Sequence, residues 1–376
     1  PTPTPTPTDT PTPTPTPTPT DTPTPTDTPT PPACFPVIEA IVPVGDAPHG
    51  LALAPALRQF YVGNHEEDTI SVVHMDSLSV LQTIAGIESP NGLAYNPDDN
   101  VLCAANRDAD SVTCVHMGLL PVRWTVPVGD LPDGIAYNPV NGHFYVANYG
   151  SDDVTVLDGA SATVLTTIWV GDEPAMVAVS PNTNKVYVTL HGDNRLAVID
   201  GSSDTLSTIV DLNSAGPYGV AVDELRNLVY VATIDTHRIV AVDGATDTFL
   251  GWVEVKRSDG TPVSLRMIGV NPHLGTSGHV YVTSSGDDAQ GVDRLLVFPK
   301  GWPEGFARPY ALDVGSIPRE GIAVNSGNGR VYVSARGDDQ VAVVWDGEPA
   351  CPPNFAAEGY IIEVKRAGST DGSTDG

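Results

Sequence analysis

A single stretch of residues returns seven times along this chain, and this repetition constrains the fold more than any other feature of the sequence. One copy, at residues 145–159, reads YVANYGSDDVTVLDG. Self-similarity at a period of about 20–50 residues is typical of repeat architectures, in which each unit buries its apolar faces against its neighbours. The copies begin at Tyr61, Cys103, Tyr145, Tyr187, Tyr230, Tyr281 and Tyr332, so successive starts lie 42, 42, 42, 43, 51 and 51 residues apart.

Each repeat contains four short runs that have the alternation of β-strands. In the third repeat these are residues 133–138, 143–148, 153–158 and 163–170, and Gly, Asn and Asp are common between them. A period of two and many β-branched residues favour antiparallel strands, and no stretch shows a helical apolar period. Four strands per unit at this spacing predict an all-β protein of the β-propeller class.

The number of blades follows from one short run of small and apolar residues that recurs in every repeat and suits the crowded innermost strand. The seventh repeat lacks an outer strand of the usual kind, whereas residues 37–50 match the outer strand and outgoing loop at 164–176. We therefore expect seven blades, with the N-terminal strand completing the last blade and closing the ring. The inner runs are residues 50–54, 92–96, 134–138, 177–180, 219–223, 268–271 and 321–325.

The composition divides the chain into three segments. Residues 1–33 form a Pro/Thr-rich stalk, in which Pro at every second position removes backbone donors and favours extended polyproline II backbone. Such a composition is typical of O-glycosylated extracellular spacers. Residues 34–351 form the predicted propeller. Residues 352–376 form an extension with an edge-strand candidate at 360–366, which the sequence does not place, and a Gly/Ser/Thr/Asp tail.

The charge and the lack of long apolar runs limit the partners. The chain has 46 Asp plus Glu against 18 Lys plus Arg, a formal net charge of −28. Such a polyanion is repelled by nucleic acid and by anionic lipid, so neither is an expected partner. No apolar run is long enough to span a bilayer, so membrane insertion is not expected either. With the stalk, these features favour an extracellular or cell-surface location.

The four cysteines, an even number, are consistent with disulfides in a secreted protein. Cys34 and Cys351 are expected at the same face of blade seven, where a bridge would replace its missing loop and contribute about 4–5 kcal/mol. Cys103 and Cys114 are expected directly opposite each other on adjacent strands, close enough for a second bridge. The alternative is that Cys103 and Cys114 are two buried thiols.

The aligned segments YVAN, YVTL, YVAT, YVTS and YVSA, with the surrounding pattern VGDxPxGIAxNP, resemble the YVTN-type β-propeller repeat family over residues 37–347. The resemblance implies a propeller of the kind found in secreted and surface-layer proteins of bacteria and archaea. Within the pattern, the glycines of Pro-x-Gly and of the Asp-Gly turn are expected to adopt conformations that other residues resist. The Tyr-Val pairs are expected to pack between blades.

Function is expected where the repeats differ, on the face of the ring that carries the loops before each inner strand and between the second and third strands. His49, His65, His191 and His237 fall on this face, together with Asp133 and other acidic residues. Imidazole and carboxylate bind zinc, copper or calcium, so these five residues are a candidate divalent-cation site. The alternative is a solvated acidic surface. The variable residues of Pro-x-Gly are His49, Asn91, Asp133, Ala175 and Tyr218, with Arg319 and Glu320 in the last blade.

The sequence favours a binding or assembly module over an enzyme. It has no motif of a zinc protease, an α/β-hydrolase, a haem site or a phosphate loop. The expected partner is a protein or glycan at the cell surface, or a second copy of the chain. The alternative is an enzyme of the lyase, lactonase or redox-subunit type, using His49, His191 and His237 with Glu66 or Asp133 as acid–base partners.

An insertion at residues 299–310 carries three aromatic residues. Trp302 and Phe306 could contact a partner, because aromatic side chains on a loop can stack on sugars or anchor a protein. The alternative is that they cover the core of their own blade, with Tyr310.

Overall fold

The computed structural model describes residues 36–118, 122–273, 278–285, 293–299, 309–318, 321–346 and 360–367. The chain separates into two units, Pro1–Ala33 and Cys34–Gly376, and all described residues belong to the second. The predicted stalk, the Cys34–Cys351 bridge and the partner residues Trp302 and Phe306 therefore lie outside the described residues, as do Arg319 and Glu320.

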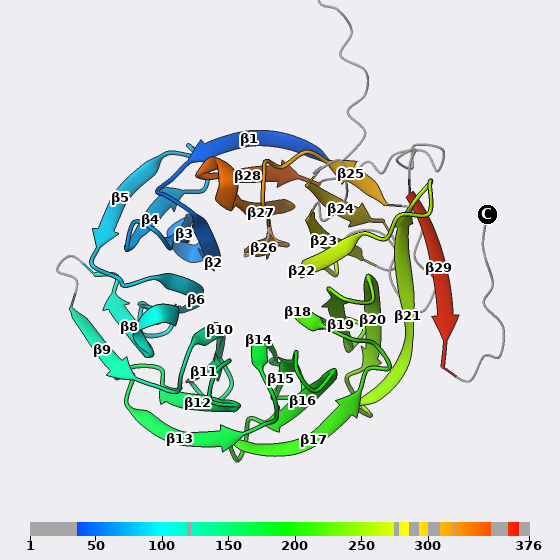
Figure 1. The fold of residues 1–376 in the computed structure, drawn as a ribbon. Coiled ribbons are helices and arrows are strands. Elements are labelled where there is room, and N and C mark those ends of the chain that lie inside the picture. The colour runs from blue at the N-terminus through cyan, green and yellow to red at the C-terminus, as the bar shows by residue number, and fades with distance from the viewer. Residues whose placement is uncertain are drawn as a thin grey trace, which may run out of the picture. The chain divides into compact units, whose positions relative to one another are not determined.

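Seven antiparallel sheets surround a central axis (Figure 1), which confirms the prediction of a seven-bladed, all-β propeller. The innermost strands are β2 (Pro48–Ala54), β6 (Pro90–Asn96), β10 (Pro132–Asn138), β14 (Pro174–Ser180), β18 (Pro217–Asp223), β22 (Ser264–Asn271) and β26 (Ile322–Asn325). The second strands are β3 (Gln59–Asn64), β7 (Val101–Asn106), β11 (His143–Asn148), β15 (Lys185–Leu190), β19 (Leu228–Thr233), β23 (His279–Ser285) and β27 (Arg330–Ala335).

The third and outer strands complete the blades. The third strands are β4 (Thr69–His74), β8 (Ser111–His116), β12 (Asp153–Asp158), β16 (Arg195–Asp200), β20 (Arg238–Asp243), β24 (Arg294–Phe298) and β28 (Gln340–Trp345). The outer strands are β5 (Val80–Ala85), β9 (Arg123–Pro127), β13 (Val164–Trp169), β17 (Thr205–Asp211), β21 (Thr248–Arg257), β25 (Tyr310–Leu312) and, in blade seven, β1 (Val37–Pro43). The helices in the described part are single 3-10 turns: η1 (Pro55–Leu57), η2 (Arg107–Ala109) and η3 (Arg336–Asp338).

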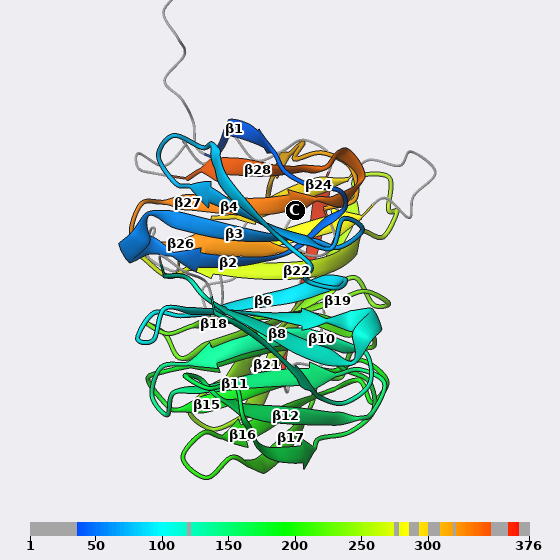
Figure 2. The same cartoon turned by 90° about the vertical axis from the view of Figure 1, so that its left-hand side faces the viewer.

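The N-terminal strand lies in the same sheet as the last three propeller strands. Strand β1 pairs antiparallel with β28, from Val37 opposite Trp345 to Pro43 opposite Gln340. In Figure 2 the blue β1 and the orange β28 lie next to each other. Pro43 is tolerated there because an outer strand has one edge without a partner strand.

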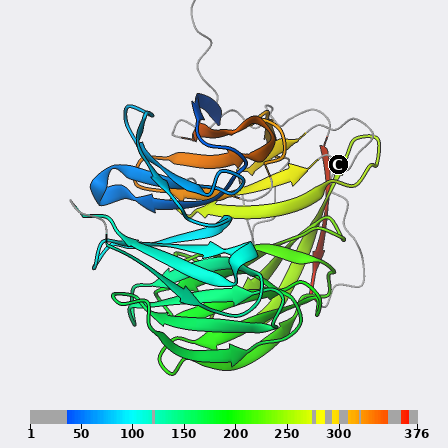
Figure 3. The same cartoon turned by 60° about the vertical axis from the view of Figure 1, so that its left-hand side comes forward.

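Blade five has a fifth strand, which the sequence pattern suggested without placing it. Strand β29 (Tyr360–Arg366) pairs antiparallel with β21, with Tyr360 opposite Arg257 and Arg366 opposite Gly251. Figure 3 shows the red β29 alongside β21 at the outer edge of the sheet. Tyr360 and Ile362 are buried in the apolar layer that blade five shares with blade six.

The apolar core consists of layers between consecutive blades, as the Tyr-Val pattern predicts. Tyr145 of blade three packs with Val186 and Val188 of blade four, and its side chain is fully buried. Its hydroxyl also donates a hydrogen bond to Asp204, in the turn between the third and fourth strands of blade four. Each repeat thus supplies one side of a layer that only the next repeat completes.

The prediction that the glycines of Pro-x-Gly adopt an unusual backbone conformation is wrong for the first three blades. Gly50, Gly92 and Gly134 are absent from the residues with positive φ, so their backbone is ordinary. A Cβ on Gly92 would instead lie 2.5 Å from the backbone oxygen of Asp133 in the next blade. A Cβ on Gly134 would lie 2.7 Å from that of Ala175. Close approach of neighbouring inner strands, and not backbone conformation, therefore requires these glycines.

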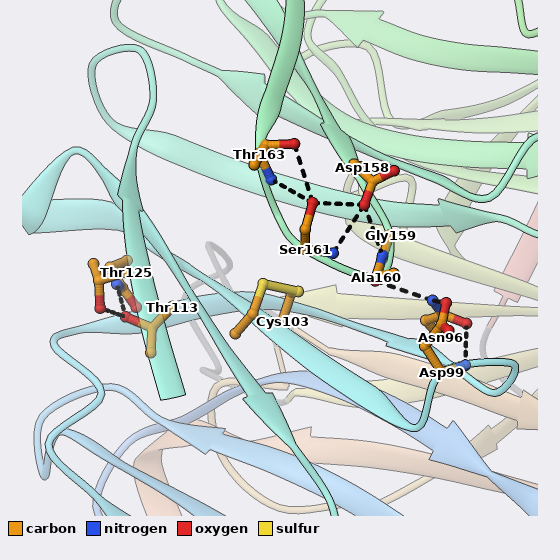
Figure 4. The surroundings of a disulfide bond; sticks show 12 residues. Asn96, Asp99, Cys103, Thr113, Thr125, Asp158, Gly159, Ala160, Ser161 and Thr163 are labelled. Carbon is orange, nitrogen blue, oxygen red and sulfur yellow. Dashed lines mark hydrogen bonds between the residues drawn. A yellow bond between two sulfur atoms is a disulfide. The ribbon is translucent and has the colours of Figure 1, made fainter. Parts of the chain in front are cut away.

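Cys103 and Cys114 lie directly opposite each other on β7 and β8 and form a disulfide, which confirms that prediction. Figure 4 shows the bond near the turn of blade three, in which Asp158 accepts hydrogen bonds from Ser161. Both cysteines are fully buried.

No helix in the described part of the chain is both long enough and apolar enough to cross a membrane.

Candidate functional site

The variable residues of Pro-x-Gly lie at one mouth of the central channel, where six of the seven inner strands begin with a register shift. In β2 the shift against β3 falls between Pro48 and Leu51, and the same irregularity opens β6, β10, β14 and β18. In β22 it falls between Leu265 and Ile268, so Arg266 occupies the variable position of blade six. Arg266 is not among the predicted site residues because this repeat lacks Pro-x-Gly, although the match of residues 268–271 with residues 135–138 places Arg266 at the position of Asp133.

Three of these residues, from three successive blades, form a chain of side-chain contacts. His49 Nδ1 lies 2.5 Å from Asn91 Oδ1, and Asn91 Nδ2 donates a hydrogen bond to Asp133 Oδ1. The side chains are almost completely buried, with 5%, 5% and 1% of their surface exposed. Residues 42 positions apart in the sequence thus become neighbours around the axis.

The chemistry of these three side chains decides which atom donates and which accepts in each contact. A carboxylate only accepts hydrogen bonds, so the amide nitrogen of Asn91 must face Asp133. The amide oxygen then faces His49, whose Nδ1 must carry the proton that it donates. The contact chain therefore holds the His49 ring in one orientation and one tautomer.

Asp133 is the centre of a larger network. Its Oδ2 lies 3.0 Å from Arg107 Nη1 and accepts a hydrogen bond from the hydroxyl of Tyr218 at 3.2 Å. Arg107 belongs to the loop between the second and third strands of blade two, so both sets of loops on this face contribute. A buried carboxylate is stable only when it is paired and hydrogen-bonded, and these contacts supply both.

Aromatic rings and cations surround the network. The guanidinium of Arg107 lies 5.3 Å from the centre of the Tyr149 ring, and that of Arg266 lies 4.8 Å from the centre of the Tyr218 ring. His191 lies 6.3 Å from the rings of both Tyr149 and Tyr218. Burial, followed by the carboxylate of Glu173, raises the pKa of Tyr149, so this hydroxyl stays protonated at neutral pH.

The predicted histidines fall into separate environments. His65 stacks on His49, with ring centres 4.5 Å apart and an interplanar angle of 5°. His65 Nε2 also lies 3.7 Å from an Asp108 carboxylate oxygen. His191 lies between two tyrosines, as described above. His237 lies in the loop of blade five, where its backbone oxygen accepts a hydrogen bond from Val255.

Within the described residues, no group of three or more His, Cys, Asp or Glu side chains is arranged to hold a metal ion. The Asn91 amide separates the His49 imidazole from the Asp133 carboxylate, so these two candidate ligands bind the amide and not a shared ion. Glu66, a candidate acid–base partner, lies 3.2 Å from Arg336. The divalent-cation site at this mouth stays a prediction from residue types.

Below the mouth, the inner strands enclose a cavity of about 160 Å³. Asn91 is the one polar side chain among its lining residues, and the glycines of the inner strands expose polar backbone groups beside one aliphatic residue from each inner strand. Asn91 therefore belongs both to the polar network and to the wall of this cavity. The aliphatic lining residues are Leu51, Leu93, Ile135, Val177, Val220, Ile268 and Ile322.

No protein-family model matches the chain, and no curated protein matches it in sequence. Among solved structures, a chain of Kuenenia stuttgartiensis hydrazine synthase is 20% identical over 68% of this chain and 76% of that one, with a TM-score of 0.56. A chain of the mitotic checkpoint complex is 14% identical over 85% and 95%, with a TM-score of 0.69. The WD40 repeats of RRP9 are 11% identical over 82% and 100%, with a TM-score of 0.65. At such identities these similarities establish the propeller fold and no activity.

Proposed function

We propose that this chain is a secreted or cell-surface binding module of the YVTN-repeat type, and that the channel mouth with its surrounding loops holds a protein or glycan partner. The observation that carries this proposal is the buried network around Asp133. Its polar groups bind one another from four blades, and a fully connected network of this kind is rigid and preformed. Such a network supports a fixed recognition surface better than an open reaction centre.

The charge of the surrounding loops supports a protein partner with a basic face. Acidic side chains at the loop tips of this face are exposed, and exposed charges of one sign speed the approach of a complementary partner. A glycan partner remains the alternative within this proposal. The exposed acidic residues are Glu66, Glu67, Asp68, Asp108, Asp110, Asp235, Asp338 and Asp339.

The disulfide in blade two supports an extracellular location, because disulfides form and persist in oxidising compartments. The proposal can be tested with fluorescently labelled protein added to intact cells of the producing organism. We expect saturable binding that weakens as salt is raised, since exposed charges are screened. Removal of surface proteins by protease should abolish it, whereas a glycan partner would survive this treatment.

A double variant, Asp108→Asn with Asp235→Asn, locates the binding face. We expect it to bind cells several-fold more weakly, through a slower association rate. The matched control is Glu224→Gln, because Glu224 is an exposed acid in the turn between β18 and β19, on the opposite face. Absence of cell binding, or an equal effect of the control, would contradict the proposal.

The contact chain from His49 to Asp133 favours one second candidate, an acid–base enzyme with His49 as the proton-transferring group. The fixed tautomer is what such a group requires. The two candidates differ in one experiment. An enzyme turns over a lactone or other substrate and loses this turnover in His49→Ala, His191→Ala or His237→Ala, whereas a binding module shows no turnover even in the unmodified chain.

A further inference from the structure

A second concave site lies at the rim of the propeller, beside the outer strands β21 and β29 of blade five. It has a volume of about 590 Å³, within the range of about 300–1,000 Å³ that is usual for pockets of small ligands. The residues that line it are unusual for this chain, because three are basic and two are aromatic. They are Asn213, Arg238, Phe249, Trp252, Lys365, Arg366 and Ala367.

The fifth strand of blade five makes this cleft. Lys365 of β29 lies directly opposite Trp252 of β21, and directly opposed residues in an antiparallel pair project from the same face. That face meets blade four, since Trp252 packs with Val210 and Leu212. Because the described part of blade four has four strands, the fifth strand of blade five has no counterpart there. Lys365 of this strand lines the cleft together with the aromatic residues Phe249 and Trp252.

The basic groups have unused capacity to bind an anion. Arg238 stacks on Trp252 at 3.8 Å, but its polar contacts are long, at 3.4 Å to the Asn213 backbone oxygen and 3.7 Å to Glu254. A guanidinium has five N–H donors, so these two contacts leave most of them available. Lys365 is exposed and has no ion pair among the residues that the structure describes.

Lys256, on the same sheet, shows the contrasting arrangement. Its ammonium lies 2.8 Å from Glu254 and 3.7 Å from Glu363, and it does not line the cleft. Its charge is therefore already compensated. Lys365, which lines the cleft, has no such ion pair among the described residues, in a chain with a net charge of −28.

We propose that this cleft binds a small organic oxyanion, whose carboxylate or sulfate contacts Lys365 and Arg238 and whose body lies against Phe249 and Trp252. The net charge sets the size of the ligand. A long polyanion would be repelled by the acidic remainder of the surface, whereas a ligand that fits within the cleft lies closer to the basic groups than the screening length of about 8 Å. A uronic acid, which joins one carboxylate to a sugar ring, has these properties.

Isothermal titration calorimetry of the full chain at an ionic strength of about 0.15 M, where the screening length is about 8 Å, tests the proposal. The probes are D-glucuronate, neutral D-glucose as its uncharged counterpart, and inorganic sulfate as an oxyanion without a carbon skeleton. We expect saturable binding of glucuronate, weaker binding of sulfate and none of glucose. In Lys365→Ala the affinity for glucuronate should fall by about tenfold or more, as expected for loss of one charge-assisted contact.

Lys256→Ala is the matched control and should retain the affinity of the unmodified chain. The proposal is overturned if glucuronate does not bind, if the two lysine variants weaken its binding equally, or if glucose binds as well as glucuronate. If sulfate binds as tightly as glucuronate, the proposed contact of the sugar ring with Phe249 and Trp252 is refuted. Neither lysine is buried, so both variants are expected to fold, which circular dichroism verifies.

Discussion

The glycine of Pro-x-Gly lies where inner strands of neighbouring blades approach most closely. Gly92 has no room for a side chain because the backbone oxygen of Asp133 occupies the place of its Cβ. The same residue, Asp133, carries the carboxylate at the centre of the mouth network. The contact between Gly92 and Asp133 therefore links the distance between blades two and three to the position of the Asp133 carboxylate at the mouth.

We predict that Gly92→Ala lowers the free energy of unfolding by about 1–3 kcal/mol, the usual cost of overpacking. The added methyl group would push Asp133 away, so binding at the mouth should weaken as well. Urea denaturation measures the first effect. Gly327→Ala is the control, because Gly327 is exposed and its nearest neighbour, an Asn325 side-chain oxygen, lies 3.3 Å from the added Cβ. Equal destabilisation by both variants would contradict the steric explanation.

The disulfide replaces the tyrosine and valine that oppose each other in other repeats, such as Tyr145 with Val156 and Tyr187 with Val198. Blade two therefore exchanges a large buried ring for a covalent bond between the same two strand positions.

We predict that Cys103→Ala with Cys114→Ala lowers the free energy of unfolding by about 3 kcal/mol, the loop-closure contribution expected for a bridge of this span. Reduction should destabilise the unmodified chain and leave the variant unchanged. Cys103→Tyr with Cys114→Val restores the residues of the other repeats, and it should recover part of the loss. A wild-type melting temperature that does not respond to reduction would refute the prediction.

At the scale of the element, β29 shows how one strand can be added to a blade without changing the ring. It pairs along the free edge of β21, and alternate residues insert into the layer between blades five and six. Its two adjacent isoleucines face opposite sides, since Ile362 is 7% exposed and Ile361 is 42% exposed.

We predict that Ile362→Asp releases β29 from the sheet, because a buried carboxylate without a partner is costly. Hydrogen exchange should show loss of protection at residues 360–366 while the inner strands stay protected. Ile361→Asp should change stability by no more than about 0.5 kcal/mol, as is usual for surface positions. The rim cleft should lose glucuronate binding only in the first variant. Retained protection in Ile362→Asp would show that backbone pairing alone holds the strand.

At the scale of the whole molecule, the repeated tyrosine makes the fold sensitive to alkali. Burial raises the pKa of Tyr61, Tyr145, Tyr187, Tyr281 and Tyr332 above the ordinary value of 10.0. In two of them a hydrogen bond to a carboxylate adds to the effect, from Tyr145 to Asp204 and from Tyr281 to Asp346. The folded state thus keeps protons that the unfolded chain loses.

We predict that stability is fully retained below pH 10 and falls as the pH rises further, since the unfolded state ionises first. Each such tyrosine contributes a slope of about 1.4 kcal/mol per pH unit between its unfolded and folded pKa values. Urea denaturation between pH 8 and pH 11 measures the slope. Tyr187→Phe should reduce it by the share of one tyrosine, and an unchanged slope would contradict the assignment.

The repeat made most of the fold predictable. The seven inner runs, the four strands per blade and the opposition of Cys103 and Cys114 all follow from patterns within a single repeat or from counting the repeats. Such patterns depend on neighbours in the chain, which the sequence displays directly. The histidines, Asn91 and Asp133 could likewise be assigned to one face, because loop order alone decides it.

The contacts between blades could not be predicted in the same way. That Asn91 separates His49 from Asp133, that Arg266 joins the mouth and that Gly92 abuts a carbonyl oxygen depend on the distance between blades around the axis. The blade that receives β29, and with it the rim cleft, depends on which outer edge offers an apolar layer to complete. The sequence by itself therefore determined the blades and their number through local alternation, whereas the sites between blades were decided by tertiary packing, which brings together residues that no local pattern relates.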